Sequence, residues 1–374
     1  MPDQKSGPLP LWLELLVLGG MVALATKLNS LIYPPPTGDE DLSHPHKEAH
    51  AIQQARARQP GRGRQAKTPV AIPPAGWLDI FWRVYHRTID DRLLLVAAGV
   101  VFYLLLALFP AVTAFVSSYG LFADPLTISE NLSALAAVMP EAGVGLVEEQ
   151  VKRLNETSQG ALSFGFLFGL AFAFWSANAG MLAVIEALNV AYGEREKRSY
   201  LELYSLSFAL TIGAMLLLLA ALSAVVVMPL VLGSLGLEAS DLSATVAVLR
   251  WPALIVMALL WLAFLYRVAP SRRDAKWRWI TIGSLFAVVA WMGVSGLYSW
   301  YLSHIANYAA TYGSLGAAIG LMMWLWFSVI VMLIGAELNA EIEHQTACDT
   351  TVGEEKPLGT RGAVMADTVG RRWL

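Results

Sequence analysis

The stretch YGSLGAAIGLMMWLWFSVIVMLIGA at residues 312–336 is apolar over its whole length and long enough to cross a lipid bilayer as a helix. A bilayer core requires about 20 apolar residues in a helix, because only a helix or a closed barrel satisfies its own backbone there. Five further segments of this kind precede it, at 93–119, 161–191, 203–232, 251–269 and 279–302. The sequence therefore predicts an all-α polytopic membrane protein, a helical bundle with a six-helix core.

The composition agrees with this class and excludes several kinds of site. Of the 374 residues, 56% are hydrophobic and 15% are charged, which is far from the profile of a soluble domain. The single cysteine, Cys348, excludes an intramolecular disulfide and a cysteine zinc cluster. Because no His or Asp frames Cys348 in a recognisable motif, we interpret it as a bystander rather than a reactive thiol.

The distribution of Lys and Arg between the hydrophobic segments predicts an orientation. One set of connecting segments, together with the C-terminal tail, carries 21 basic residues, and the other set carries 4 including Lys5. The rule that cytoplasmic loops are rich in Lys and Arg places the first set in the cytoplasm. Both ends of the six-helix core are then cytoplasmic.

The chain before the core predicts an anchor and a linker. An extra apolar segment at 9–33 reads as an N-terminal transmembrane anchor spanning residues 1–33, with its N-terminus outside. Ala23-Leu24-Ala25 resembles a signal cleavage site, but cleavage would leave nine basic residues on the wrong side. Residues 34–76 are rich in Pro, Gln, Arg and Gly, and their composition predicts a disordered cytoplasmic linker.

The membrane domain is predicted to begin with an interfacial helix. Trp77, Ile80, Phe81 and Val84 recur at helical spacing up to Asp91, with charged residues between them. This pattern is typical of an amphipathic helix at the inner membrane surface. We therefore expect a membrane domain at 77–344 and a cytoplasmic tail at 345–374.

Polar residues inside the apolar segments are the candidate functional residues, because such groups are costly in a bilayer. Glu186 lies about 12 Å along a helix before the charged turn that follows its segment. We expect its carboxylate to pair with an arginine of the 267–273 segment. The transport-pathway and structural interpretations of these residues both remain open. The candidates are Asn178, Glu186, Arg267, Arg272, Arg273 and Glu337.

Small residues and one proline are candidates for shaping the bundle. GxxxG patterns let helix backbones approach closely, and Pro110 is expected to kink the first core helix. Two segments share the pattern of Gly, Leu, Trp and Glu at an offset of 151 residues, but their neighbouring segments do not align. We therefore interpret the likeness as coincidence rather than as a repeat. The candidate helix-packing glycines are Gly165, Gly169, Gly316 and Gly320.

Three stretches resemble the YihY/BrkB family of bacterial inner-membrane proteins, also labelled virulence factor BrkB and historically ribonuclease BN. They are AAGVVFYLLLALFPAV at 97–112, YRVAPSRRDAKWRWITIGSLFA at 266–287 and YGSLGAAIGLMMWLWFSVIVMLIGAELNAEIEH at 312–344. The resemblance covers about two-thirds of the chain, from Asp90 to His344. It implies six transmembrane helices in a bacterial inner membrane, and it supplies no catalytic residues to carry over. The extra N-terminal helix and its linker depart from the family pattern.

The residues do not favour enzymatic chemistry. RNA hydrolysis usually needs clustered carboxylates or a paired His on a folded surface, whereas the acids here are scattered among short loops. No metal or other cofactor is expected, because His44, His46 and His50 lie in a linker that does not pre-organise ligands. No GxxxxGK[ST] motif occurs, so the chain holds no P-loop ATPase.

Two functions remain as hypotheses. A transporter or flippase-like protein for a small or amphiphilic solute fits six helices with few polar groups. A non-transporting envelope or virulence-associated scaffold fits equally well. The expected partners are the lipid bilayer, anionic lipid headgroups at the basic linker, and a second copy in a homo-oligomer; no nucleic acid is expected.

Overall fold

The computed structural model describes residues 51–122, 159–227, 241–305 and 315–373. Within these ranges, side chains at 108–122, 159–170, 226–227 and 241–244 and at three single helix positions are not described. The chain divides into two units, Met1–Ile52 and Gln53–Leu374, and the second is described below. The predicted N-terminal anchor at 1–33 lies outside the described residues.

The described residues are helical, and no strand occurs among them, which confirms the all-α membrane class. Five helical stretches are long and apolar enough to cross a membrane, and a shorter apolar stretch occupies Leu93–Ala107. The predicted number of six spans stays a prediction. The long helices are α4 (Leu93–Phe122), α7 (Gln159–Ala191), α8 (Tyr200–Leu222), α10 (Asp241–Val268), α11 (Thr281–His304) and α13 (Gly316–Gln345). The shorter elements are α3 (Pro74–Asp90), α14 (Val364–Asp367), the 3-10 helices η1 (Pro69–Ala71) and η3 (Trp277–Trp279), and the π-helix η2 (Ser223–Val227).

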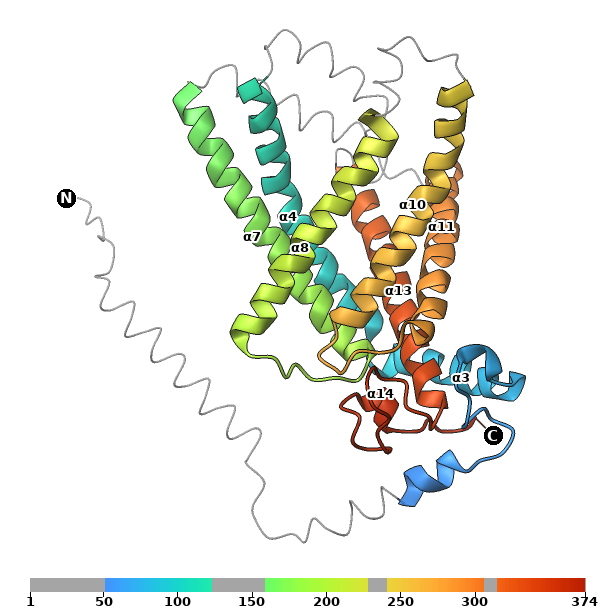
Figure 1. The fold of residues 1–374 in the computed structure, drawn as a ribbon. Coiled ribbons are helices and arrows are strands. Elements are labelled where there is room, and N and C mark those ends of the chain that lie inside the picture. The colour runs from blue at the N-terminus through green and yellow to red at the C-terminus, as the bar shows by residue number, and fades with distance from the viewer. Residues whose placement is uncertain (1–50, 123–158, 228–240, 306–314, 374) are drawn as a thin grey trace, which may run out of the picture. The chain divides into compact units, whose positions relative to one another are not determined.

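The long helices pack as two main antiparallel pairs, α4 with α7 and α11 with α13 (Figure 1). α8 packs on α7 and α10 packs on α11, while α13 also contacts α3, α4, α7 and α14. We call the basic end the end at which α4, α8 and α11 begin and α7, α10 and α13 end. The main apolar core lies toward this end and includes Leu188, Tyr192, Tyr266, Leu333 and Ala340.

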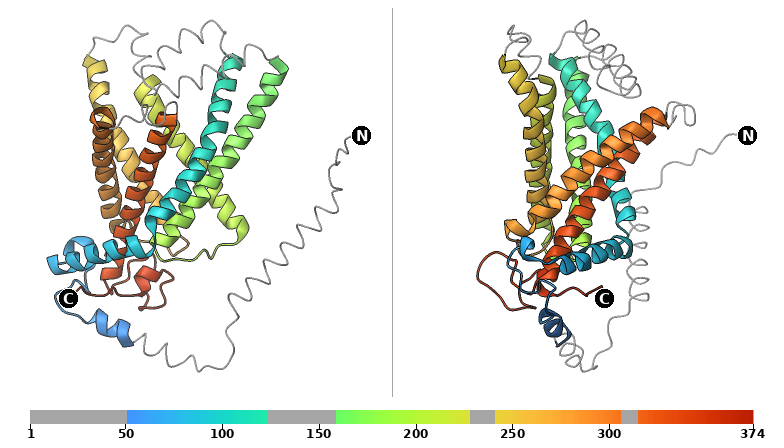
Figure 2. Two further views of the ribbon diagram at one scale, coloured as in Figure 1. Left: turned by 180° about the vertical axis from the view of Figure 1, so that it is seen from behind. Right: turned by 90° about the vertical axis from the view of Figure 1, so that its right-hand side faces the viewer.

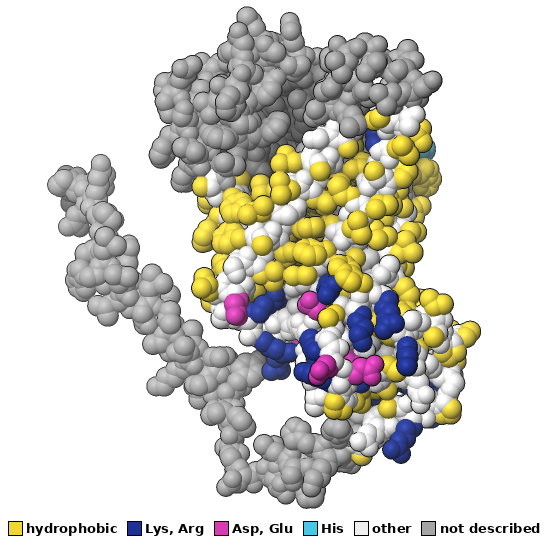
Figure 3. All heavy atoms as spheres, viewed as in Figure 1, with side chains coloured by type: hydrophobic (Ala, Val, Ile, Leu, Met, Phe, Trp, Pro, Cys, Tyr) yellow, Lys and Arg dark blue, Asp and Glu magenta, His cyan; other side chains and the backbone are white. Residues whose placement is uncertain are grey.

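Charged and apolar side chains separate along the helices (Figure 3). Apolar side chains cover the described helices, and Lys, Arg, Asp and Glu gather at the basic end. Large apolar side chains on α8 and α10 are exposed, such as Leu218 at 60% and Leu260 at 59%. Such a continuous apolar surface is what a helical bundle presents to lipid rather than to water.

Helices α11 and α13 approach each other closely at Gly283 and Gly335. A Cβ atom added at Gly283 would collide with the Gly335 carbonyl oxygen, and one at Gly335 would lie 2.8 Å from the Ala287 Cβ. The Gly283 backbone N–H also donates to Asn339 Oδ1 at 2.7 Å. Gly283 and Gly335 were not among the predicted packing glycines, because they lie 52 positions apart on different helices and form no GxxxG pattern.

The predicted packing glycines lie in α7 and α13. Gly316 and Gly320 are buried at the start of α13, and the Tyr298 hydroxyl donates to the Gly320 carbonyl at 2.9 Å. Gly165 and Gly169 lie in the part of α7 whose surroundings are not described, as does Pro110 in α4. The predicted roles of these last three residues stay predictions.

Helix α3 lies across the basic end of the bundle (Figure 2) and packs against α13 and α4. Asp79, Ile80, Arg83 and Val84 are buried. The opposite face is apolar and exposed, with Leu78 and Phe81 at 55%, Tyr85 at 64% and Ile89 at 54% exposed. Exposed apolar faces of this kind occur where a helix contacts lipid or another protein.

Candidate functional site

The predicted pair between Glu186 and an arginine of the 267–273 segment is wrong. Glu186 is exposed on α7 and forms no ion pair within the described part of the chain. Arg272 pairs with Glu343 instead, and Arg267 lies 3.5 Å from Asp274 and over the ring of Trp277. The depth of Glu186 stays a prediction, but the rotation of α7 points Ile185 and Leu188, rather than Glu186, into the core.

Buried charges meet instead where α13 ends beneath α3. Glu337, Glu341 and Glu343 are each fully buried, although they follow one another within two turns of one helix. Buried carboxylates are costly unless they are paired. We call the group that pairs them the charged cap, which consists of Asp79, Arg83, Arg87, Arg272, Glu337, Glu341 and Glu343.

The first half of the charged cap consists of ion pairs between α3 and α13. Arg83 Nε donates to Glu341 Oε2, and Arg87 Nε lies 2.7 Å from Glu337 Oε1 without alignment for a hydrogen bond. Arg83 and Arg87 are four positions apart on α3, so they lie on one face of that helix. Glu337 and Glu341 are likewise four positions apart on α13. Because the two helices cross in opposite order, Arg83 meets the later glutamate and Arg87 the earlier one.

The second half of the charged cap faces the loop between α10 and α11. Arg272 donates through both terminal nitrogens to the two carboxylate oxygens of Glu343, each at 2.8 Å. The Arg272 guanidinium also lies 4.3 Å from the ring centroid of Tyr192. Burial lowers the pKa of Arg272, but the Glu343 carboxylate outweighs burial and raises the pKa above its usual value. Arg273 makes no side-chain ion pair here, and its backbone N–H donates to Gly362 O at 3.0 Å.

The segment after α13 folds back beneath the charged cap. Arg361 is 4% exposed and donates to the carbonyl oxygens of Ala347 at 2.7 Å and Ala366 at 2.6 Å. The Val364 backbone N–H donates to Glu194 Oε1 at 2.6 Å, which fastens the tail to the loop after α7. The tail is therefore folded over its described length, up to residue 373.

The prediction of a disordered linker at 34–76 is wrong for residues 53–76, whereas residues 34–50 lie outside the described ranges. Arg64, Ala66 and Ile72 are buried, and the Arg64 carbonyl accepts from the Ala347 N–H at 2.7 Å. The composition rule tests only whether a segment can bury its own surface. Here the segment packs against the end of α13 and the tail instead.

The loop between α7 and α8 holds a second, smaller cluster. Glu196 Oε1 accepts from Arg198 Nε at 2.8 Å, and Glu196 Oε2 accepts from Asn189 Nδ2 at 3.1 Å. Burial raises the pKa of Glu196, but these hydrogen bonds outweigh burial and lower the pKa to about 2. The Asn189 amide oxygen also accepts from the Ser271 N–H at 2.7 Å, so this cluster joins two loops of the basic end.

Two predicted polar residues lie in different surroundings. Asn178 is 3% exposed and accepts a hydrogen bond from the Ser207 hydroxyl, which links α7 to α8. Glu337 lies within the charged cap, so the structure buries one of the two matching glutamates and exposes the other. Sequence reasoning missed Asp79, Arg83, Arg87, Glu341 and Glu343, although the four-residue spacings in α3 and α13 were a usable signal.

An apolar cavity of about 240 Å³ lies among α8, α10, α11 and α13. Its position is roughly 10 to 15 Å along α11 from the basic end, which is bilayer depth. Trp291 Nε1 donates to Ser328 Oγ at 3.0 Å beside it. We call this space the apolar cavity; its lining residues are Leu217, Ala258, Trp261, Leu262, Ala287, Val288, Trp291, Ser328 and Met332.

Comparison with known proteins finds one matching family and several related proteins. Residues 84–358 match the family described as virulence factor BrkB. The ribonuclease-like protein YfkH of Bacillus subtilis (strain 168) is 35% identical over 65% of this chain and 88% of its own length. UPF0761 membrane proteins of Idiomarina loihiensis and Pseudoalteromonas atlantica are 28% and 26% identical, over 58% and 75% of this chain and 74% and 94% of their own lengths. No solved structure matches the chain.

Proposed function

This chain belongs to the virulence factor BrkB family of membrane proteins, and from that premise we propose that it moves an amphiphilic solute within or across the bilayer. The observation that carries the proposal is the apolar cavity, which lies at bilayer depth; the indole N–H of Trp291 and the hydroxyl of Ser328 in its lining are hydrogen-bonded to each other, and the other lining side chains are apolar or aromatic. Such a lining, apolar with few polar groups, is typical of ligand sites.

The size of the apolar cavity narrows the solute class. Its volume of about 240 Å³ is smaller than the roughly 300 to 1,000 Å³ of sites that enclose a whole drug-sized ligand. An acyl tail or a similar slender apolar group fits, while its polar head remains outside. A flippase-like protein that handles one lipid-like tail is therefore favoured over a transporter for a bulky hydrophilic solute.

The charged cap supports a protein with a closed and an open arrangement. Its ion pairs join α3, α13 and the α10–α11 loop at the basic end, below the apolar cavity. A solute could not leave through this end while the pairs hold. We propose that the structure corresponds to an arrangement closed on the basic side, and that transport requires some of these contacts to separate.

The same proposal assigns the basic end to the cytoplasm of a bacterium, in its inner membrane. The support is the gathering of Lys and Arg at that end, as the positive-inside rule requires. The exposed apolar face of α3 would then lie in the cytoplasmic leaflet. The predicted external N-terminus remains part of this proposal.

Flux in proteoliposomes tests the function. We expect wild-type protein to accelerate transbilayer movement of a fluorescent short-chain phospholipid above the rate in protein-free liposomes. Ala258→Phe fills the apolar cavity and should lower the protein-dependent rate about tenfold, which corresponds to about 1.4 kcal/mol. Val256→Phe is the matched control, because Val256 is 55% exposed on the same helix. Equal rates with and without wild-type protein, or equal loss in both variants, contradict the proposal.

The alternative function is an envelope scaffold that transports nothing. The folded tail beneath the charged cap favours it, because a structured surface at the basic end can serve as a docking platform. Wild-type protein without any flux would favour this alternative. We propose no ribonuclease activity, since the cap carboxylates described above are engaged with arginines rather than grouped for metal binding.

A further inference from the structure

A second cavity, of about 680 Å³, lies outside the matched family region, where residues 57–71 curl around it. Its lining contains three cationic side chains, Arg58, Arg64 and Lys67, and no carboxylate. Gly61 and Gly63 have φ values of +70° and +78°, a conformation that favours glycine and bends this loop. We call this space the basic pocket.

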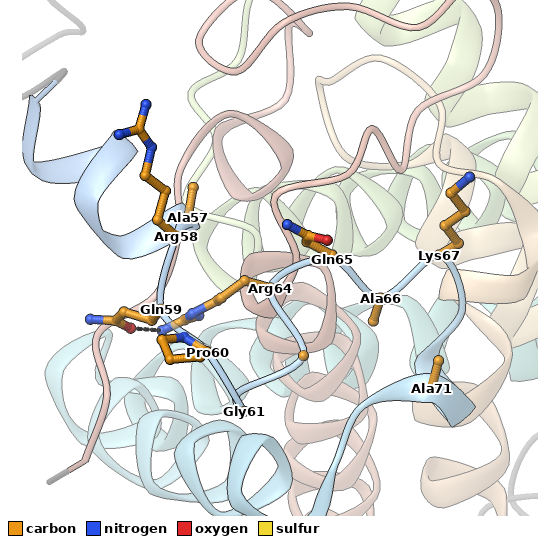
Figure 4. Close-up of a pocket in the computed structure, with 11 residues that line it drawn as sticks. Ala57, Arg58, Gln59, Pro60, Gly61, Arg64, Gln65, Ala66, Lys67 and Ala71 are labelled. Atoms are coloured by element: carbon orange, nitrogen blue, oxygen red, sulfur yellow. Dashed lines mark hydrogen bonds between the residues drawn. The ribbon is translucent and has the colours of Figure 1, made fainter.

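The side chains of the basic pocket divide into two groups (Figure 4). Arg58, Gln65 and Lys67 are exposed, and Arg58 and Lys67 rise from opposite ends of the segment. Neither Arg58 nor Lys67 forms a hydrogen bond or ion pair with any described residue. Arg64 turns toward Gln59 and donates to its Oε1 at 2.9 Å. The basic pocket therefore offers two cations without partners beside a cation that is held in place.

Arg64 anchors the basic pocket and is itself not fully satisfied. It is 2% exposed, and its terminal nitrogens donate to the carbonyl oxygens of Gln345 at 3.2 Å and Gly370 at 2.8 Å. Its Nε is buried and has no hydrogen-bond partner within the described part of the chain. An unpaired buried donor on a cation is costly, so a hydrogen-bond acceptor within reach of this Nε would stabilise Arg64.

Burial and neighbouring arginines both act against the charge of Arg64. Burial and then the charge of Arg83 lower the pKa of Arg64 to about 10. The pKa of Arg56 is lowered as well, by burial and by the charges of Arg371 and Arg83. Asp79, the carboxylate that acts in the opposite direction on Arg64, is already paired with Arg62 at 2.7 Å. A bound anion would offset these positive charges.

We propose that the basic pocket binds a phosphoryl group, held by Arg58 and Lys67 at its rim and by the field of Arg64. Arginine and lysine together are the usual ligands of phosphate oxygens. The phosphoryl group belongs either to a lipid headgroup or to a free phosphate. Val70, which is 89% exposed next to the lining residue Ala71, and the apolar face of α3 would bring lipid near this loop.

Phosphate and lipid binding to the full-length protein test the proposal in two arms, one in a neutral detergent and one in nanodiscs, which separates the two sources of the phosphoryl group. One arm titrates inorganic phosphate against sodium chloride at equal ionic strength. The other compares nanodiscs of phosphatidylcholine alone with nanodiscs that also contain phosphatidylglycerol. The readout is the melting temperature of the wild type, of the double variant Arg58→Gln with Lys67→Gln, and of the control Arg195→Gln. Arg195 is exposed at the same end and forms no ion pair with any described residue.

We expect a saturable rise in melting temperature for the wild type and the control, and an apparent affinity at least about tenfold weaker in the double variant. A response to phosphate and to phosphatidylglycerol supports a site for the phosphoryl group itself, and a response to phosphatidylglycerol alone supports a lipid headgroup site. No response in either arm, or an equal response in the double variant, overturns the proposal. Both replaced side chains are exposed, so the variants should fold, which their melting in chloride checks.

Discussion

Gly283→Val is expected to be among the most damaging single substitutions in the membrane domain. A Cβ at position 283 would meet the Gly335 carbonyl oxygen and the Asn339 side chain, which are backbone and buried groups that cannot move aside cheaply. Overpacking of this kind lowers the free energy of unfolding by about 3 kcal/mol, because α11 and α13 must separate. We expect a large drop in melting temperature or loss of the folded protein in detergent.

The matched control is Gly293→Val on the same helix. A Cβ at Gly293 has no neighbouring atom within 4 Å, so only the helix propensity changes, and there Val is better than Gly. The control should therefore melt close to the wild type. Equal melting temperatures for the two variants would show that α11 and α13 do not approach each other at Gly283.

Arg83→Met is expected to cause a comparable loss of stability. It keeps most of the side-chain volume but removes the shortest ion pair of the fully buried Glu341 carboxylate. Arg87 Nε, 3.8 Å from Oε1, and His344 Nδ1, 3.3 Å from Oε2, remain beside it. Breaking a buried ion pair by removing one partner costs about 3 to 5 kcal/mol. The melting temperature in detergent measures this loss, and Arg195→Gln is the control for removing a cation at an exposed position.

The double variant Arg83→Met with Glu341→Gln separates pairing from packing. If the two charges compensate each other, the double variant should be more stable than the sum of the two single losses predicts. Some loss should remain, because Arg83 also donates to Gln345 Oε1 at 2.7 Å and to Arg371 O at 2.8 Å. Strictly additive losses would show that Arg83 and Glu341 do not form a pair in the folded protein.

The sequence allowed prediction of the apolar helices, but not of their rotation about their own axes. Hydrophobic length placed the apolar segments, because a bilayer sets that length directly. Glu186 and Glu337 occupy matching positions near the same end of their helices, yet one is exposed and the other buried. The difference depends on which face of each helix meets its neighbours. When a helix is apolar all round, the pattern of apolar residues carries almost no information about that face.

The charged cap could not be predicted from the sequence for a related reason. Its members come from α3, from the loop before α11 and from α13, and only the fold brings them together. Positive-inside counting explained Arg83 and Arg87 as topology signals, which drew attention away from their partners in α13. Residues 53–76 and the tail pack against each other and against α13. The composition of either segment alone does not indicate this packing.

In the proposed function an amphiphile enters the apolar cavity. Cross-linking with a phospholipid whose acyl chain carries a photoactivatable group, followed by mass spectrometry of the labelled peptides, tests this directly. We predict labelling of Trp261 and Met332, which line the apolar cavity, and its suppression by Ala258→Phe but not by Val256→Phe. Labelling confined to outward-facing residues such as Leu218 and Leu260, and unchanged by Ala258→Phe, would contradict the account.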